Sequence, residues 1–109
     1  MVDRSMVIYE VNLDVDCAIE SDYLGWLWPH IDQLLAIDGF EEAAVLQRPS
    51  KQPGRFGLTC HYHLRDHDAL QAYFDVHAAR LRGDGVDRFA GRFEAWRRVL
   101  EPLDRASDL

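Results

Sequence analysis

Hydrophobic and polar residues alternate along the first part of the chain, from Met6 to Val15. Alternation with a period of two predicts a half-buried β-strand, because successive side chains point to opposite faces of a sheet. One face of this strand carries Val7, Tyr9, Val11, Leu13 and Val15, and the other carries Ile8, Glu10, Asn12 and Asp14. The second face is therefore polar except for Ile8.

The next apolar residues recur at intervals of three and four between Ile19 and Ile37, which predicts an amphipathic helix. Its core stripe comprises Leu24, Leu27, Ile31, Leu34 and Leu35. Pro29 lies inside this helix and removes one backbone hydrogen bond, so we expect a bend there. The Asp38-Gly39 pair that follows is typical of a helix end.

Two further strands are predicted at Phe40–Arg48 and Arg55–Leu64, on either side of a segment rich in proline, glycine and polar residues at 49–54. Such a segment between two strand patterns predicts a hairpin. The inward face of the second strand is expected to hold Phe56, Leu58, Cys60, Tyr62 and Leu64.

A second helix is predicted to begin at Asp66, whose carboxylate can cap the first turn. Its buried stripe comprises Leu70, Tyr73, Phe74, His77 and Leu81. We expect Gly83 and Gly85 to end this helix, because glycine is a poor helix former. A short helical turn over 86–90 and a last strand over Arg92–Leu100 complete the pattern.

The order strand, helix, hairpin, helix, strand predicts an α+β fold, the ferredoxin-like β-α-β-β-α-β plait, with a four-stranded antiparallel sheet and both helices on one face. We expect residues 1–109 to form one domain, with its core at about 6–101 and a frayed tail at 102–109.

The other face of the sheet is expected to expose an apolar patch that includes Ile8, Ala43, Val45 and Trp96. The simplest cover is the sheet of a second copy, so we expect a homodimer in which the two sheets pack face to face. The candidate interface residues are Ile8, Glu10, His61, His63 and Trp96.

Charge is distributed unevenly in this chain, whose net charge is −7. Residues 1–50 hold ten acidic and two basic residues, whereas residues 51–109 hold nine acidic and ten basic residues. The negative balance argues against a nucleic-acid partner, which requires a basic face. The two unequal halves could attract each other within one chain or across a dimer.

Composition also bears on the compartment. No apolar run approaches the roughly 18 residues that would span a bilayer, and residues 1–5 lack the apolar core of a signal peptide. Cys17 and Cys60 have neither redox-motif nor zinc-site spacing. We therefore expect a cytoplasmic protein with free thiols and no membrane partner.

The opening and closing segments resemble a small bacterial family known only as a domain of unknown function. The opening segment is Val7-Ile8-Tyr9-Glu10-Val11-Asn12, and the more specific closing segment is residues 84–100, DGVDRFAGRFEAWRRVL. The resemblance extends from Met6 to Glu101. In layout this family is similar to the dimeric α/β-barrel proteins, which include antibiotic-biosynthesis monooxygenases, stress-responsive barrel proteins and muconolactone-isomerase-like enzymes. The resemblance implies the fold and a dimer, and it transfers no catalytic residue.

Aromatic and histidine side chains recur at helical spacing and predict a ligand cleft between the helices and the sheet. The candidate lining residues are Tyr9, Trp26, His30, Tyr62, Tyr73, His77 and Arg97. Tyr23 shares the helix side of Trp26 and His30. The alternative is that these aromatics simply form the core and that each histidine bonds a carbonyl group.

Arginine is abundant near the end of the chain, at positions 80, 82, 88, 92, 97 and 98. Arg97 and Arg98 must face opposite sides of the sheet if the last strand is regular. The one that enters a partly buried region needs an anion. Glu10 or Glu94 could supply it, as could the carboxylate of a ligand.

No established catalytic motif occurs in the sequence. His61 and His63 share one strand face and could reach a metal with Glu10 or Asn12, but a metal site needs three or four convergent ligands, so we favour an interface role for both histidines. We expect no metal and no prosthetic group. Three functions stay open: a binder of a small aromatic or carboxylate-bearing ligand, a cofactor-free monooxygenase- or isomerase-like enzyme, and a structural interaction domain.

Overall fold

The computed structural model describes residues 5–103, in the order β-α-β-β-α-α-β with one added 3-10 turn. The elements are β1 (Val7–Asp16), η1 (Cys17–Ile19), α1 (Glu20–Leu35), β2 (Phe40–Arg48), β3 (Arg55–Leu64), α2 (His67–Val76), α3 (Ala78–Phe89) and β4 (Phe93–Leu100). Most of the tail expected to fray, 102–109, lies outside the described residues.

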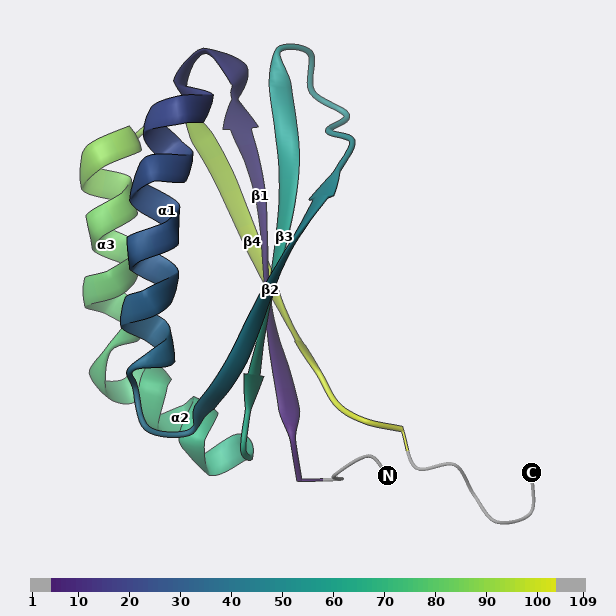
Figure 1. Ribbon diagram of the computed structural model, residues 1–109, viewed down its shortest axis with the longest axis vertical. Coiled ribbons are helices and arrows are strands. Elements are labelled where there is room, and N and C mark those ends of the chain that lie inside the picture. The colour runs from purple at the N-terminus through teal and green to yellow at the C-terminus, as the bar shows by residue number, and fades with distance from the viewer. Residues whose placement is uncertain (1–4, 104–109) are drawn as a thin grey trace.

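The four strands form one antiparallel sheet in the order β2-β3-β1-β4. Helices α1, α2 and α3 all cover the same face, and the opposite face carries no other element of the described chain (Figure 1). This is the ferredoxin-like plait that the sequence predicts.

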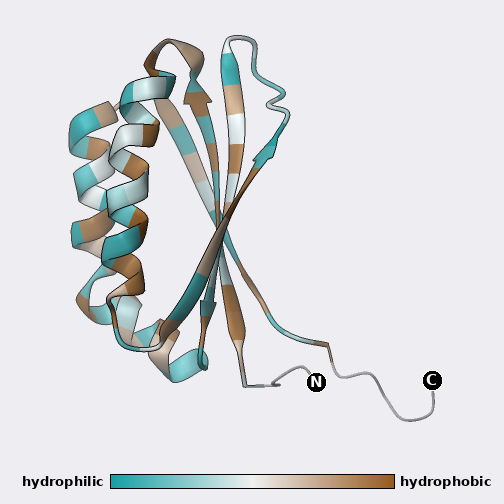
Figure 2. Ribbon diagram, in the orientation of Figure 1, coloured by the Kyte–Doolittle hydropathy of each residue, from teal (hydrophilic) through white to brown (hydrophobic). Residues whose placement is uncertain are grey.

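The core lies between the helices and the covered face of the sheet. Hydrophobic segments of the strands and of the helices meet there (Figure 2). Helix α1 contributes Tyr23, Leu27, Ile31 and Leu34, which recur at helical spacing and are all buried. Burying one such apolar side chain contributes about 1.5–3 kcal/mol, so this stripe fixes the helix onto the sheet.

Aspartate carboxylates cap the starts of α2, as the sequence predicts, and of η1. The Asp66 carboxylate accepts the backbone N–H of Ala69 at 2.8 Å and caps α2. The Asp16 carboxylate accepts the N–H of Ala18 at 2.9 Å at the start of η1. Helix α1 continues through Pro29 to Leu35.

The expected helix end at Gly83 and Gly85 is wrong. Helix α3 passes through both glycines, and the break falls earlier, at His77, between α2 and α3. A glycine costs a helix about 1 kcal/mol relative to alanine. Packing offsets that cost, because the Trp26 indole lies so close to Gly85 that a Cβ there would come within 2.9 Å of it.

Ala43 and Val45 lie on the helix side of the sheet, which corrects their expected place on the open face. The register of β2 against β3 shifts between Phe40 and Glu42. A bulge adds one residue and thereby exchanges the faces of all residues beyond it. Ala43 is therefore paired with inward-facing Tyr62, and Leu46 comes to the open face beside Thr59.

Candidate ligand site between the helices and the sheet

A cavity opens between helices α1 and α3 and the covered face of the sheet. Every strand except β2 contributes to it, and its lining is mostly apolar. The lining residues are Tyr9, Val11, Leu13, Tyr23, Trp26, Leu27, His30, Leu34, Cys60, Tyr62, Tyr73, Leu81, Arg82, Gly85, Phe93 and Arg97.

Tyr9 on β1 is at the centre of the aromatic wall. Its ring centroid lies 6.1 Å from that of Tyr62, 5.6 Å from that of Tyr73 and 5.5 Å from that of Phe74. Tilted and edge-on contacts of this kind add about 0.5–1.5 kcal/mol each beyond burial. The wall is therefore held in place before any ligand binds.

Trp26 and His30 form the α1 side of the cavity. One helical turn separates them, and their rings stack with centroids 4.4 Å apart and an interplanar angle of 22°. The far side of the indole lies against Gly85 of α3. The orientation of the His30 imidazole thus depends on the close approach of α1 and α3.

Two buried nitrogen atoms that line this cavity have no hydrogen-bond partner within residues 5–103: Nδ1 of His30 and Nε of Arg82. The Nη2 atom of Arg82 donates to the Tyr9 hydroxyl at 2.8 Å, which holds the guanidinium in place. An unpaired buried polar group costs about 1–3 kcal/mol. Buried polar groups are normally hydrogen-bonded, so two unpaired ones on residues that line the same cavity make it a candidate ligand site.

Arg97 lies on β4 opposite Val11, which faces the helices, so its side chain belongs to the cavity side. Arg98, the next residue, binds Glu10 on the open face. The expectation that the two arginines face opposite sides is thus confirmed. Within the described chain, Arg97 has no hydrogen bond or ion pair.

The protein environment changes the acid–base properties of several lining groups. Burial lowers the pKa of His30, with Asp84 acting in the opposite direction and Arg97 in the same direction as burial. The imidazole is therefore neutral at neutral pH. Burial raises the pKa of Cys60 to about 11 and that of Tyr73 to about 12, so both stay protonated.

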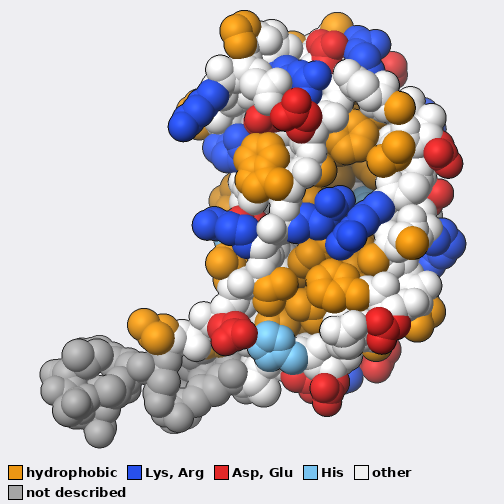
Figure 3. Space-filling model, turned by 180° about the vertical axis from the view of Figure 1, so that it is seen from behind, with side chains coloured by type: hydrophobic (Ala, Val, Ile, Leu, Met, Phe, Trp, Pro, Cys, Tyr) orange, Lys and Arg blue, Asp and Glu red, His pale blue; other side chains and the backbone are white. Residues whose placement is uncertain are grey.

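The cavity is small inside and open outside. Its interior measures about 50 Å³, whereas the space including the mouth measures about 490 Å³. Since one water needs about 10–15 Å³ of such interior, the inner part holds a few waters or one polar group, and an aromatic ring would extend into the mouth. Seen from the side of β4 and α3, arginine side chains cross a hollow between hydrophobic side chains (Figure 3).

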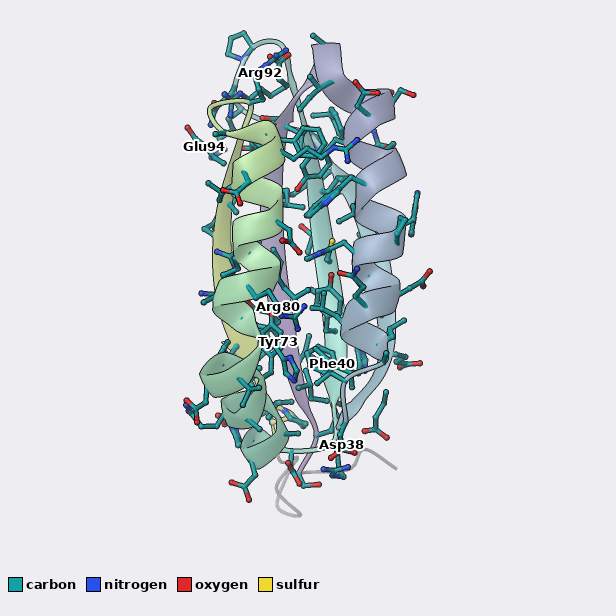
Figure 4. All side chains as sticks on the ribbon, turned by 90° about the vertical axis from the view of Figure 1, so that its left-hand side faces the viewer. Asp38, Phe40, Tyr73, Arg80, Arg92 and Glu94 are labelled. Carbon is teal, nitrogen blue, oxygen red and sulfur yellow. The ribbon has the colours of Figure 1, made fainter. Side chains whose placement is uncertain are left out.

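Six of the seven predicted cleft residues line this one cavity: Tyr9, Trp26, His30, Tyr62, Tyr73 and Arg97. His77 does not line it. His77 lies at the α2–α3 junction, where its Nδ1 is 3.0 Å from Nη2 of Arg80, and it lines a separate groove with Asp38 and Arg65. Viewed from the helix side, Tyr73 and Phe40 lie toward one end of the gap between α1 and α3, whereas Arg92 and Glu94 lie beyond the opposite end of α3 and on its outer side (Figure 4).

Sequence reasoning did not assign Arg82 and Gly85 to the cleft. Gly85 lay beyond the expected end of the helix at Gly83, and Arg82 lay in its last turn, next to Leu81 of the buried stripe. Continuing the pattern of Tyr73, Ala78, Leu81 and Phe89 through the glycines would have shown that this face points toward the sheet.

The open face of the sheet carries a charged network. Glu10, Asn12 and Asp14 alternate along β1 and are 3–6 % exposed. The Glu10 carboxylate accepts hydrogen bonds from Arg98 and Asn12 and lies 2.9 Å from Nε2 of His61. These partners, led by Arg98 and opposed by burial, lower the pKa of Glu10 to about 2.

The other predicted interface residues share this face. His63 lies 3.2 Å from Glu42, and Ile8 pairs with His63 across β1 and β3. The Arg48 guanidinium lies 4.8 Å above the Trp96 ring and binds Asp14 at 3.1 Å. Among residues 5–103, no three metal-ligating side chains come together.

The sequence from 6 to 103 matches a family described as a domain of unknown function, DUF4286. The chain belongs to the DUF4286 family. None of the curated proteins matches this DUF4286 sequence. No helix between residues 5 and 103 has the length and apolar character needed to cross a membrane.

Solved structures share the fold of this DUF4286 protein. SnoaB from Streptomyces nogalater, a cofactor-independent oxygenase, is 12% identical with a TM-score of 0.66, covering 94% of this chain and 98% of its own. Rv0793 from Mycobacterium tuberculosis is 24% identical with a TM-score of 0.64, covering 94% and 100%. A protein of the ethyl tert-butyl ether D (EthD) family from Bacillus halodurans is 19% identical with a TM-score of 0.62, covering 89% of this chain and 99% of its own. The DUF4286 chain therefore has the fold of the dimeric α+β barrel proteins.

Proposed function

We propose that this DUF4286 protein binds a small aromatic ligand with an acidic group, in the cavity between the helices and the sheet. The observation that supports this most is that two residues lining one mostly apolar cavity, His30 and Arg82, each hold a buried nitrogen without a partner in residues 5–103. Ligand sites commonly combine an apolar lining with a few fixed polar groups.

Charge favours an anionic group. Arg82 and Arg97 both line the cavity, and no acidic side chain of residues 5–103 does. Guanidinium groups bind carboxylates, enolates and phosphates through charge-assisted hydrogen bonds. The Trp26 indole in the lining suits an aromatic ring of the ligand.

A thermal-shift screen of small aromatic and enolic acids tests this function. A ligand at one hundred times its dissociation constant stabilises the fold by about 2.7 kcal/mol, which for a domain of this size raises the melting temperature by about 10 °C or more. His30→Ala and Arg82→Gln should abolish the shift, whereas His77→Ala, outside the cavity, should retain it. If no compound in a broad screen shifts the wild-type protein, a structural interaction domain is the better account.

A cofactor-free enzyme is the second candidate, and His30 is the observation that favours it. A neutral imidazole with a free nitrogen at a cavity can accept a proton from a substrate. The fold shared with SnoaB adds support, although a shared fold alone does not determine chemistry. The test is to measure the rate of a catalysed reaction against pH in the wild type and in His30→Gln. A pH dependence that is present in the wild type and absent from His30→Gln would establish this function.

The same proposal includes a homodimer through the open face of the sheet. That face presents Leu46 and Trp96, which are 50 % and 44 % exposed in the single chain, around the charged network of β1.

The free thiols of Cys17 and Cys60 are consistent with a reducing cytoplasm.

A further inference from the structure

We propose that the cavity binds its ligand as an oxyanion formed on entry: an acidic phenol or enol transfers its hydroxyl proton to Nδ1 of His30, and the oxygen left behind accepts a hydrogen bond from Nε of Arg82. This inference rests on the proposed ligand-binding function and narrows its ligand class.

His30 is suited to take the proton. Its Nδ1 is buried and has no partner within residues 5–103, while stacking on Trp26 fixes the plane of the ring. Burial keeps the imidazole neutral by lowering its pKa. A neutral imidazole has one nitrogen that can accept a proton.

Arg82 is suited to hold the oxyanion. A guanidinium only donates, so its unpaired Nε–H requires an acceptor. The hydrogen bond from Nη2 to Tyr9 prevents the side chain from turning away to solvent. Arg82 is half-buried and lines the cavity, and a guanidinium held in place in this way stabilises negative charge with little reorganisation.

Other charged and titratable groups surround this pair. Arg97 of β4 stabilises the oxyanion, and Asp84 of α3 favours the imidazolium that forms. The remaining titratable groups of the lining are Tyr9, Tyr23, Cys60, Tyr62 and Tyr73. The pKa values of Tyr23, Cys60, Tyr62 and Tyr73 are all raised by burial, so these four groups are neutral and do not compete for the proton.

The transfer is balanced without a further reactant. The O–H bond of the ligand breaks, its electron pair stays on oxygen, and an N–H bond forms at His30. The product is an oxyanion–imidazolium pair beside two arginines, and no proton leaves the protein. A carboxylate, by contrast, is already ionised at neutral pH and gives His30 nothing to accept.

The probe is 4-nitrophenol, which absorbs in the visible range as the phenolate but not as the phenol. Below the probe's own pKa, adding wild-type protein should produce phenolate absorbance, with the apparent pKa of the bound probe lowered by at least one unit, a tenfold change in ionisation. In weak buffer with a pH indicator, binding should release no proton. One proton released per bound probe would overturn the transfer to His30.

Variants separate the roles of the two residues. His30→Gln should bind the probe with proton release or as the neutral phenol, and Arg82→Gln should lose the phenolate absorbance. Arg88→Gln, on the same helix but outside the cavity, should behave as the wild type. A phenolate signal in His30→Gln that still appears without proton release would overturn the inference.

Two further probes distinguish this inference from the proposed function. 4-Nitroanisole cannot ionise, and 4-nitrobenzoate is a carboxylate. Tighter binding of nitrobenzoate than of nitrophenol, or binding of nitrophenol only as the neutral phenol, would overturn the oxyanion inference and leave the ligand site standing. Failure of all three probes to bind would count against both.

Discussion

At the scale of single residues, Glu10 is a charge kept in an almost completely buried position by its neighbours. Its side chain is only 4 % exposed, yet it is ionised because Arg98, Asn12 and His61 all reach its two oxygens. Removing one partner from such a group leaves a buried charge without compensation, which costs more than the pair itself contributes.

Glu10 should make the stability of the protein depend on acid. Its pKa is lowered from 4.5 in the unfolded chain to about 2 in the fold, so its contribution is complete above pH 4.5 and is lost as the pH falls toward 2. The exposed Arg98 is screened by solvent, so we expect about 1–3 kcal/mol. Urea unfolding of wild type and Glu10→Gln between pH 6 and 2 measures this.

In Glu10→Gln the slope of stability against pH should flatten across that window. Glu42→Gln is the matched control, because Glu42 lies on the same face but is 71 % exposed. Equal slopes in the wild type and Glu10→Gln would contradict the assignment.

At the scale of elements, the approach of α3 to α1 shapes the cavity. Gly85 permits Trp26 to lie against α3, whereas Gly83, two residues earlier, has nothing within 4 Å of where its Cβ would be. The two glycines therefore have different physical roles in the same helix.

Alanine at these two positions should act in opposite directions. Gly83→Ala should stabilise the protein by about 0.5–1 kcal/mol through helix propensity alone. Gly85→Ala gains the same propensity but must displace Trp26, and overpacking of this kind costs about 1–3 kcal/mol. Thermal unfolding should rank Gly83→Ala above Gly85→Ala, and the tryptophan fluorescence should change only in Gly85→Ala. A higher melting temperature for Gly85→Ala than for Gly83→Ala would show that the contact between Trp26 and Gly85 does not limit the size of residue 85.

At the scale of the whole molecule, all three helices cover one face of the sheet and leave the other to solvent or to a partner (Figure 1). That open face combines a nearly buried row of polar residues on β1 with exposed apolar side chains on the flanking strands. A second sheet packed on it would bury both kinds of side chain.

Light scattering should therefore give twice the 12.6 kDa mass of one chain at micromolar concentration. Trp96→Asp should yield monomers, since burying an unpaired carboxylate at the interface costs several kcal/mol. Trp28→Asp is the matched control, because Trp28 is 53 % exposed on α1, away from the open face. A wild-type monomer, or equal dissociation of both variants, would contradict this interface.

Much of the fold can be predicted from the sequence because its signals are local. Alternation predicts β1, and three- and four-residue spacing predicts α1. The turn at 49–54 between two strand patterns predicts β2 and β3 with the observed bounds. The same alternation along β4 predicts that Arg97 and Arg98 face opposite sides, and helical spacing brings Trp26 and His30 together.

The rest was decided by contacts between distant segments. The bulge after Phe40 exchanges the faces of Ala43 and Val45, because pairing with β3 sets the register and composition does not. Packing of Trp26 on Gly85 extends α3 through two glycines, which brings Gly85 into the cavity lining, while the helix break at 77 places His77 outside it. Periodicity determines which face a side chain takes within an element, whereas a site depends on how the elements meet, and only tertiary packing determines that.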